Sequence, residues 1–386
     1  MPATYYGGAA ENPYRLCLGV ARLGCEVRVL TTDANGPRRT VPIEHGRDVL
    51  FAAGFEVLYA HRIMRGSAAP GLLTRLVPEV RRADVVHLTG FDPPTALPTL
   101  AACRILGRPL VWSPRGALQR WRGGSVRFAP RVIPLLGRWL APRRIAIHAV
   151  TPEEFAVCAA RMPAVAAITI PNGVRIPAEP RHEPGDGRLR IGFAGRIEPR
   201  KALENLIDAG AILRDAGLEF SLAIVGEGEK RYLRALRKRI ARRGLDEAIA
   251  SAGALHGAAR RRFFERIDLF VLPSHLENFG TATTEALARG VPVIAGRGTP
   301  WRRLDERGCG FWVDNDPAVL ADAIRRIATM PLAAMGARGR AWMREEFDWA
   351  AASRQMRNLY TALIHGVPLP SPALDASGAA ASAAAD

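Results

Sequence analysis

The sequence predicts an α/β protein built from two doubly wound parallel-sheet domains in tandem. Short apolar runs alternate with segments of helical periodicity, which is typical of βαβ units. A stretch rich in proline, glycine and charge at residues 172–190 interrupts this alternation, which then begins again. The length of 386 residues suits two domains of ordinary size.

The predicted strands are apolar segments of four to seven residues. In the first half they lie at residues 27–32, 84–89, 109–113, 145–150 and 167–171, and in the second half at residues 190–194, 220–225, 268–272 and 291–295. Helices fit between them, and the helix predicted at 203–216 is followed by Gly217 as a C-terminal cap. Ligands of such sheets bind beyond the carboxyl ends of the strands, so we expect the site in a cleft between the domains.

Composition excludes several classes of protein. No uncharged apolar run reaches 18 residues, and the first residues do not resemble a signal peptide. The five cysteines lie far apart with no Cys-x-x-Cys pair, so we expect reduced thiols in a cytoplasmic protein. The tail at 371–386 is mostly alanine and serine, which predicts disorder.

The net charge of +17 is carried by 51 arginines and only 3 lysines. A basic surface of this kind suits nucleic acid, anionic lipid or a phosphorylated substrate. The sequence contains no helix-turn-helix, zinc-finger or RNA-binding aromatic motif, so nucleic acid is not expected as a partner.

The segment at 273–301 joins a strand to a helix through a polar loop. Because it follows a strand's carboxyl end, backbone N–H groups near the start of the helix favour an oxygen-rich or anionic ligand. Glu277 lies in the loop and Glu285 about one turn into the helix, and carboxylates accept hydrogen bonds from sugar and ribose hydroxyls. The alternative is one acid that complements the helix dipole and one solvated acid. The spacing of the two glutamates alone does not decide between these two interpretations.

Two cations follow the first strand of the second half. Arg196 comes directly after Gly195 at the strand end, and Lys201 stands at the next helix. A guanidinium and an ammonium group at this position suit a diphosphate. The alternative is a pair of exposed charges with no ligand.

Together these motifs resemble the "group 1" glycosyltransferases, which are retaining enzymes of the large GT-B family commonly numbered four. The resemblance covers nearly the whole chain and includes Gly226-x-Gly228, the Glu277-x7-Glu285 segment, Gly298-Thr299-Pro300-Trp301 and the domain-crossover stretch Asn172-Gly173-Val174. It implies domains at 1–178 and 179–346, with a C-terminal helix at about 347–366 that returns to the first domain.

The resemblance also implies roles for individual residues of the second domain. Glu277 and the backbone N–H groups that follow it would hold the donor sugar, Glu285 the ribose, and the loop near Leu255 the base. The complete set of implied donor-binding residues is Gly7, Gly8, Arg196, Lys201, Leu255, Glu277, Asn278, Phe279, Gly280 and Glu285.

The first domain departs from the family in two respects. Tyr6-Gly7-Gly8 resembles the family's glycine loop, but the buried strand that precedes this loop is missing. We favour a start codon further upstream over a truncated domain. Many relatives carry histidine before the glycine of the segment Ser113-Pro114-Arg115-Gly116, where this chain has Arg115.

Three residues are therefore candidates for catalysis, namely Glu277, Arg115 and His87. Arg115 stays protonated and cannot be a general base, but it could stabilise the leaving phosphate. The alternative is a structural arginine. His87 ends a strand, where a lone histidine is as often packed as functional.

No metal or cofactor is expected. Asp314-Asn315-Asp316 has the form of a metal-binding triplet, but Asp316 precedes Pro317 and is better interpreted as a helix N-cap. Arg196, Lys201 and helix termini meet the charge of the diphosphate instead.

The stretch at 120–144 holds seven arginines and no acid, interleaved with apolar residues. This pattern occurs in helices that lie on anionic membranes, although prolines at 130, 134 and 142 argue against one continuous helix. The alternative is a partly buried helix with a basic outer face.

On this resemblance we expect a retaining glycosyltransferase with a UDP- or GDP-linked donor. The acceptor would be a hydroxyl of a glycan or lipid-linked saccharide, in cell-surface polysaccharide biosynthesis at the inner membrane face. The alternatives are a nucleotide-sugar epimerase of the same fold and a non-catalytic protein that binds nucleotide-sugars or nucleic acid.

Overall fold

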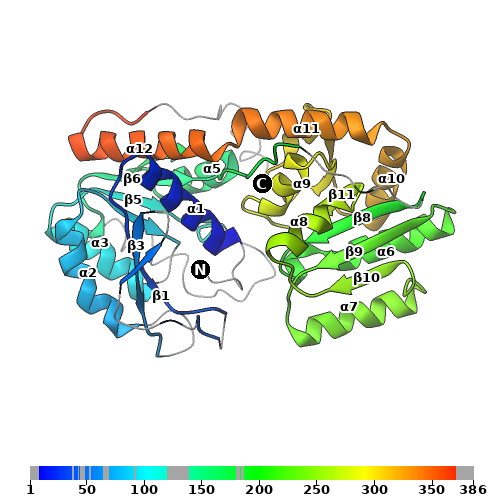
Figure 1. The fold of residues 1–386 in the computed structure, drawn as a ribbon, viewed down its shortest axis with the longest axis horizontal. Helices are drawn as coiled ribbons and strands as arrows, with labels where there is room; N and C mark the ends of the chain where they lie inside the picture. Colours follow the sequence, from blue (N-terminus) through cyan, green and yellow to red (C-terminus); the bar gives the residue numbers. More distant parts are fainter. Residues whose placement is uncertain are drawn as a thin grey trace. The chain divides into compact units, whose positions relative to one another are not determined.

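The structure is a computed structural model, in which the chain forms two compact units (Figure 1). The N-terminal unit comprises Met1–Gly173 with Trp349–Asp386, and the C-terminal unit comprises Val174–Asp348. The residues described are 8–36, 39–41, 43, 48–51, 54–63, 69–90, 93–119, 139–179, 183 and 187–370.

The C-terminal unit contains a six-stranded sheet in which every neighbouring pair is parallel. Its strands, in spatial order, are β10 (Ile249–Ala252), β9 (Phe220–Val225), β8 (Leu189–Ala194), β11 (Leu269–Leu272), β12 (Val293–Gly296) and β13 (Gly310–Val313). The chain adds strands outward from β8 in one direction and from β11 in the other. The boundary between β8 and β11 is therefore the topological switch point of the sheet.

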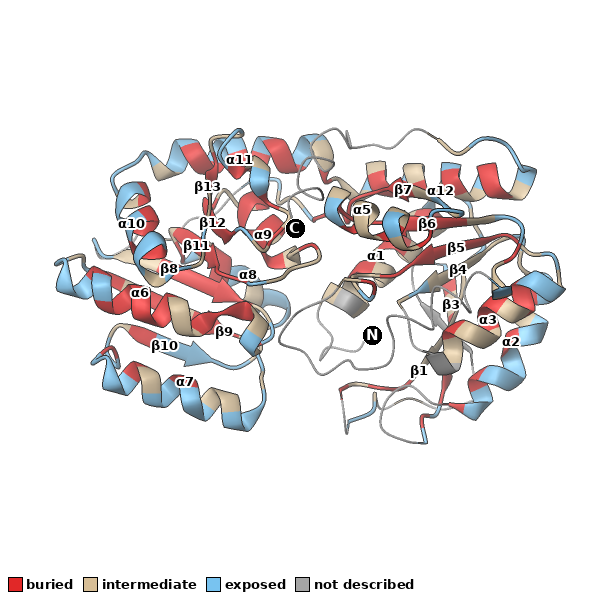
Figure 2. Ribbon diagram, turned by 180° about the vertical axis from the view of Figure 1, so that it is seen from behind, coloured by how far each residue is buried: buried red, intermediate tan, exposed pale blue. Residues whose placement is uncertain are grey.

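Helices bury both faces of this sheet, and all four residues of β11 are buried. The helices are α6 (Leu203–Asp215), α7 (Lys230–Arg242), α8 (Gly257–Glu265), α9 (Thr281–Ala288), α10 (Pro317–Ala328) and α11 (Leu332–Glu346), with 3₁₀ turns η2 (Pro199–Lys201) and η3 (Arg302–Leu304). Figure 2 shows α6 and α9 largely buried, whereas α7 keeps an exposed side. Helices α11 and α9 lie so close together that a Cβ at Gly336 would be 1.8 Å from the carbonyl oxygen of Gly290, just after α9.

The N-terminal unit contains two sheets. The first has the order β1 (Arg28–Thr32), β3 (Phe55–Ala60), β2 (Asp48–Phe51), in which β1 pairs parallel and β2 antiparallel with β3. The second is entirely parallel, with the order β4 (Val86–Thr89), β5 (Leu110–Ser113), β6 (Ile145–Ala149), β7 (Ala166–Thr169).

Successive residues along a strand of the four-stranded sheet pack against different helices on the two faces of the sheet. The helices are α1 (Gly8–Arg22), α2 (Pro70–Arg82), α3 (Pro93–Ile105), α5 (Pro152–Arg161) and α12 (Trp349–His365). Leu110 and Trp112 of β5 pack in a core with residues of α2, α3 and α5, whereas Val111 packs in a core with α1 and α12. This period of two is expected for a strand covered on both faces.

The prediction of two Rossmann-like domains with parallel sheets is confirmed, and each predicted strand overlaps a strand of the structure. Strands β2, β3, β10 and β13 were not predicted. Gly217 caps α6 as expected, with a φ of +76°.

Several predicted segments lie wholly or partly outside the described residues. Gly7 is not described, and Gly8 begins α1. Of the basic stretch 120–144 only 139–144 is described, where Trp139 is exposed, and the tail 371–386 is not described. Among the helices that are described, none has the length and apolar character required to cross a bilayer.

Candidate active site

The central strands β8 and β11 of the C-terminal sheet pair with each other, so their carboxyl ends meet at the switch point. Ligands of doubly wound sheets bind there. The loop after β8 carries Arg196 and Lys201, and the loop after β11 carries Glu277. The backbone N–H of His275 donates to the carbonyl of Arg200 over 2.8 Å, which joins the two loops.

Lys201 and Glu277 form a buried ion pair at this point. The ammonium group of Lys201 donates to Oε2 of Glu277, and the two side chains are only 8% and 12% exposed. Burial by itself raises the pKa of Glu277, but Lys201, and more weakly Arg200 and Arg196, lower it, so the net pKa lies below that of an ordinary glutamate. The alternative of an exposed, solvated lysine is therefore wrong for Lys201.

Arg196 lies at the edge of the same group. Its guanidinium is 3.4 Å from a carboxylate oxygen of Glu198, which also binds Arg200, and its side chain is half exposed. The group contains three cations and two carboxylates, a net charge of +1: Arg196, Arg200, Lys201, Glu198 and Glu277. A net positive group at a strand end suits an anionic ligand.

Two glycines bring the loop after β9 against the loop after β8. A Cβ at Gly226 would lie 1.8 Å from the carbonyl oxygen of Gly195, and one at Gly228 would lie 2.2 Å from that of Ile197. The N–H of Ile197 donates to the carbonyl of Glu227 over 2.7 Å. This close backbone approach explains the Gly226-x-Gly228 motif, because any larger residue would separate the two loops.

The loop that enters α9 is held from the segment after β12. The backbone N–H of Glu277 donates to the carbonyl of Gly298 over 2.8 Å, and the indole of Trp301 donates to the carbonyl of Phe279 over 2.7 Å. Gly280, with φ +79°, is the N-cap of α9 and has no side chain to cap the helix. The N-terminus of α9 thus faces the loop with its dipole available to a ligand.

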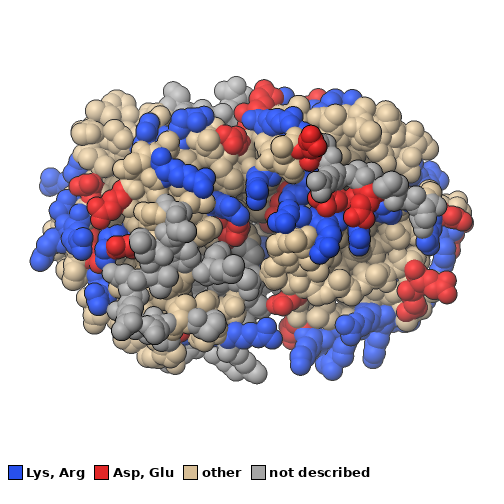
Figure 3. All heavy atoms as spheres, in the orientation of Figure 1, with Lys and Arg blue, Asp and Glu red and all other residues tan. Residues whose placement is uncertain are grey.

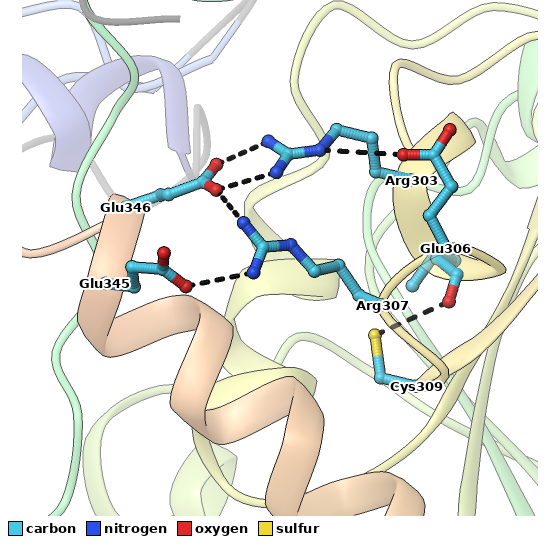
Figure 4. A network of polar contacts seen from close by, with 7 residues as sticks. Arg303, Glu306, Arg307, Cys309, Glu345 and Glu346 are labelled. Carbon is cyan, nitrogen blue, oxygen red and sulfur yellow. Dashed lines mark hydrogen bonds and ion pairs between the residues drawn. The ribbon is translucent and has the colours of Figure 1, made fainter.

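Trp301 is anchored in turn to α11. Its ring packs against Phe279, Trp342 and Phe347 with centroid separations of 5.6–5.8 Å. After Trp301 the chain enters η3. Arg303 of η3 and Arg307 beyond it both bind Glu346 at the end of α11, and Arg307 also binds Glu345 at 3.0 Å (Figure 4). This network, which we call the α11 anchor, fixes the residues that hold the loop entering α9.

Glu285 is paired with Arg260, a partner that the sequence did not reveal. Arg260 of α8 donates to its Oε2 through Nε at 2.8 Å and Nη2 at 2.7 Å. Leu255 lies in the loop that leads from β10 into α8. Helix α8 therefore follows Leu255 in the chain and binds Glu285 through Arg260, and these are the two residues predicted to contact the nucleoside. The alternative of a freely solvated Glu285 is wrong, since the side chain is partly buried and paired.

The triplet at 314–316 behaves as a structural element. Asp316 accepts from the backbone N–H of Ala318 at 2.8 Å, which confirms the predicted N-cap of α10. Asn315 donates to the carbonyl of Pro273 at 3.0 Å and contacts Nδ1 of His275 at 2.9 Å, so it also holds the loop after β11. In the described part of the chain, no three His, Cys, Asp or Glu side chains gather closely enough to bind a metal ion.

His87, in the N-terminal unit, belongs to a chain of side chains that crosses the four-stranded sheet. The contacts are Tyr360 to His87 at 2.5 Å, His87 to Ser113 at 2.6 Å, Ser113 to His148 at 2.7 Å, and His148 to the carbonyl of Ile170 at 2.8 Å. The carbonyl can only accept, so Nε2 of His148 carries the proton and Nδ1 accepts from Ser113. It follows that Nε2–H of His87 donates to Ser113 and that its Nδ1 accepts from Tyr360.

His87 and His148, the two histidines of this hydrogen-bonded series, are both neutral. Burial, then His148 and Arg115, lower the pKa of His87 well below its ordinary value. Burial and Arg115 lower the pKa of His148 to about 3. Since both ring nitrogens of His87 are engaged, a role as a base would require one of these bonds to break. Through Tyr360, this series of hydrogen bonds instead connects α12 to the carboxyl ends of the strands.

Arg115 follows β5 in a left-handed conformation, with φ +56°, which is strained for a residue other than glycine. Its Nη1 donates to Oδ1 of Asn172 at 2.5 Å. The carboxylate of Glu154, which is 1% exposed, accepts from the N–H of Gly116 at 2.5 Å and from that of Val150 at 2.9 Å. Burial lowers the pKa of Arg115 and Glu154 raises it, so the guanidinium stays charged beside a fixed carboxylate.

The structure therefore brings together the C-terminal candidates Arg196, Lys201 and Glu277, and it places Arg115 and His87 in the N-terminal unit. Sequence reasoning missed the partners Arg260, Asn315, Glu154 and Tyr360. Only Glu154 had a signal, because Thr151 lies three residues before it in the spacing of a capping box.

Two Rossmann-like units with mainly parallel sheets are the architecture predicted above for a glycosyltransferase of the GT-B fold. The chain matches the family model "Glycosyl transferases group 1" over residues 176–342 and the model "Glycosyl transferase 4-like domain" over residues 7–173. It belongs to the group 1 glycosyltransferase family, which confirms the predicted resemblance.

The chain is similar to curated proteins over half or nearly all of its length. The chain is 33% identical over 211 residues to D-inositol 3-phosphate glycosyltransferase of Streptomyces scabiei, covering 48% of this chain and 47% of that protein. The match thus spans about half of that relative's length. Glycogen synthase of Mycobacterium tuberculosis is 26% identical over 412 residues, covering 97% of this chain and 95% of the relative.

A solved structure shares the fold. HepE of Anabaena, determined in complex with UDP and with UDP-glucose, superposes with a TM-score of 0.71 at 20% identity, covering 92% of this chain and 96% of that one. At this level of identity the likeness shows the fold.

Proposed function

We propose that the protein is a retaining glycosyltransferase that moves a sugar from a nucleotide-diphosphate sugar to a hydroxyl group. The observation that carries this proposal is the buried Lys201–Glu277 pair at the switch point, flanked by Arg196 and by the N-terminus of α9. A desolvated carboxylate and ammonium group in this position offer an acceptor for sugar hydroxyls beside donors for phosphate oxygens.

The remaining roles follow from position. Arg196 and Lys201 would bind the diphosphate, the N–H groups of Asn278, Phe279 and Gly280 the sugar, and Glu285 the ribose. Arg260 binds Oε2 of Glu285, so Oε1 would accept from the ribose. The glycine loop at Gly7 and Gly8 would approach the diphosphate, and the backbone near Leu255 the base.

Arg115 is proposed to act on the leaving group. A guanidinium fixed by Asn172 is preorganised, so it can stabilise charge that develops on the departing phosphate without reorientation. No metal is required for this step, because side chains and helix termini supply the positive charge. We assign His87 to the positioning of this region, since it binds Ser113, the last residue of β5 and two residues before Arg115.

Donor and acceptor are inferred from relatives. The Anabaena structure holds UDP-glucose, which favours a UDP-sugar, and GDP-sugars are the second candidate. The names of the relatives indicate polyol phosphate and glucan acceptors, so a hydroxyl of a glycan or lipid-linked saccharide is proposed, in cell-surface polysaccharide assembly. Membrane contact through 120–144 is proposed for an acceptor at the inner leaflet.

The test combines donor binding with turnover. In a thermal-shift panel of UDP-, GDP-, ADP- and dTDP-sugars, a donor at about 100 times its dissociation constant should add about 2.7 kcal/mol of stability. Glu285→Ala should lose this shift and the hydrolysis or transfer of the donor, whereas Asp322→Ala, on the exposed side of α10, should retain both. Equal activity of Glu285→Ala and wild type would refute the assignment of the site.

A further inference from the structure

Helix α7 of the C-terminal unit presents an outward side made almost entirely of cations. Six of its exposed residues are basic: Lys230, Arg231, Arg234, Arg237, Lys238 and Arg242. The other exposed residues of the helix are Ala235 and Ala241, and its sequence contains no acid. We call these six residues the α7 cationic face; Figure 3 shows Lys and Arg gathered at lower right, where Figure 1 draws α7.

The inward side of α7 accounts for its packing without these residues. Leu236 and Ile240 are buried, Arg239 binds Asp208, and the hydroxyl of Tyr232 donates to Glu204 at 2.7 Å. None of the six cations of the face forms an ion pair with a carboxylate in the described part of the structure. Their charges therefore form no ion pair that attaches the helix to the described part of its own unit.

The arrangement of the six charges is unfavourable for an isolated helix. Lys230 and Arg234, Arg234 and Lys238, and Lys238 and Arg242 are like-charge pairs at a spacing of four, each of which destabilises a helix. Lys230 and Arg231 also occupy the first turn, where the helix dipole disfavours cations. An ordinary solvated helix would alternate acids with these bases. A polyanionic partner would turn this repulsion into attraction.

The chemistry of the face favours a planar surface over a nucleic acid. The face offers no aromatic ring on which a base could stack, and it consists of lysine, arginine and alanine alone. Its cations extend over the whole helix, about 20 Å for 13 residues. A helix that lies flat on an anionic leaflet brings all of them within a Debye length of headgroup phosphates.

We propose that the α7 cationic face docks on an anionic phospholipid bilayer. The contact is electrostatic and superficial, because alanine is the largest apolar residue on the face and nothing on it can insert among acyl chains. It is distinct from the basic stretch 120–144 and does not depend on the transfer reaction. Its expected signature is strong salt dependence.

The experiment measures co-sedimentation of the full chain with vesicles at low and high salt. The vesicles are phosphatidylcholine alone, or phosphatidylcholine with about one third phosphatidylglycerol. The α7 variant replaces all six cations with glutamine, a good helix former. The control variant replaces six exposed arginines of other helices with glutamine: Arg22, Arg75, Arg81, Arg82, Arg344 and Arg354. Both variants lose the same net charge.

We expect wild type to bind only the anionic vesicles, and only at low salt. Each Lys or Arg close to an anionic leaflet raises partitioning about fivefold, so the α7 variant should lose at least about 100-fold and the control variant much less. The α7 variant should also unfold at or above the wild-type temperature, since like-charge repulsion is removed.

Equal binding by the α7 variant and wild type would overturn the proposal, as would equal losses in the two variants. Binding of duplex DNA or RNA under conditions in which wild type ignores anionic vesicles would also overturn it, and would assign the face to nucleic acid.

Discussion

Individual residues of this protein act through partners that are distant in sequence. Lys201 and Glu277 are 76 positions apart, yet each compensates the charge of the other in a nearly buried site. A buried pair adds little net stability, but the removal of one partner leaves an uncompensated charge. The same pair that is proposed to bind the donor therefore also holds two loops in place.

The first prediction concerns this pair. Lys201→Met should lower the free energy of unfolding by about 3 kcal/mol, because it leaves Glu277 buried without its cation. The double variant Lys201→Met/Glu277→Gln should lose clearly less than the sum of the single variants. Urea denaturation measures all three, and Asp322→Asn, which removes an exposed pair with Arg325, should change stability by less than about 1 kcal/mol. Additive losses would show that the two charges do not interact.

A second prediction concerns the pH dependence of His148. Its pKa is about 3 in the folded state and about 6.5 when unfolded, so the unfolded chain binds one more proton between these values. Stability is then fully present above pH 6.5 and falls by up to about 1.4 kcal/mol per unit as pH decreases towards 3.

His148→Gln retains a donor for the carbonyl of Ile170 and removes this titration. We expect the slope of unfolding free energy against pH, measured between pH 6.5 and 5, to decrease by about one proton. An unchanged slope would mean that His148 is protonated in the folded protein.

At the scale of elements, nine strands could be predicted from the sequence, including the edge strands β1, β4 and β7, whereas β2, β3, β10 and β13 could not. Strand β11 is a continuous apolar run, β8 is apolar after Arg190, and both end in polar loops. Strand β10 is mostly exposed, and β13 contains only three consecutive apolar residues, so neither is marked by a long apolar run. Strand β3 is buried, but Glu56 interrupts its apolar run.

The candidate site follows the same rule. Residues directly after central strands could be predicted, because their position depends on local order and on sheet topology. The partners Arg260 and Asn315 could not, because α8 and the loop before α10 reach the site only through tertiary packing. One arginine among 51 carries no signal of its own.

The loops after β8 and β9 give an element-scale prediction. Gly226→Ala should destabilise the protein by at least about 3 kcal/mol, since the new Cβ would overlap the carbonyl oxygen of Gly195. Gly253→Ala is the matched control, because a Cβ there meets nothing within 4 Å, and it should be nearly neutral. Thermal unfolding of both variants measures the difference, and similar midpoints would contradict the close approach of the two loops.

On the scale of the whole molecule, the chain passes between its units twice, at 173–174 and at 348–349. The two passages run side by side, because Val174 bridges Asp348 and its N–H donates to the carbonyl of Phe347 at 2.7 Å. The C-terminal unit is one continuous segment of sequence. The N-terminal unit needs α12, which adds Met356, Leu359 and Leu363 to its core.

Residues 174–348 should consequently fold alone, with cooperative unfolding in calorimetry. Residues 1–348, which lack α12, should contain a disordered or aggregating N-terminal unit. Three large buried side chains at about 2 kcal/mol each amount to about 6 kcal/mol, a large part of the stability of a domain. A native-like amide exchange pattern in the N-terminal unit of residues 1–348 would contradict this account.

The contribution of α12 to the first unit also has a consequence during translation. Leu16 and Val20 of α1 are synthesised before the C-terminal unit, but Met356 and Leu359, which cover the same core, are synthesised after it. At about 5–20 residues per second, the roughly 190 residues between Gly173 and the end of α12 take on the order of 10–40 s. Throughout that interval an apolar sheet face of the nascent chain is available to chaperones. The unit whose synthesis begins first is the last to be completed.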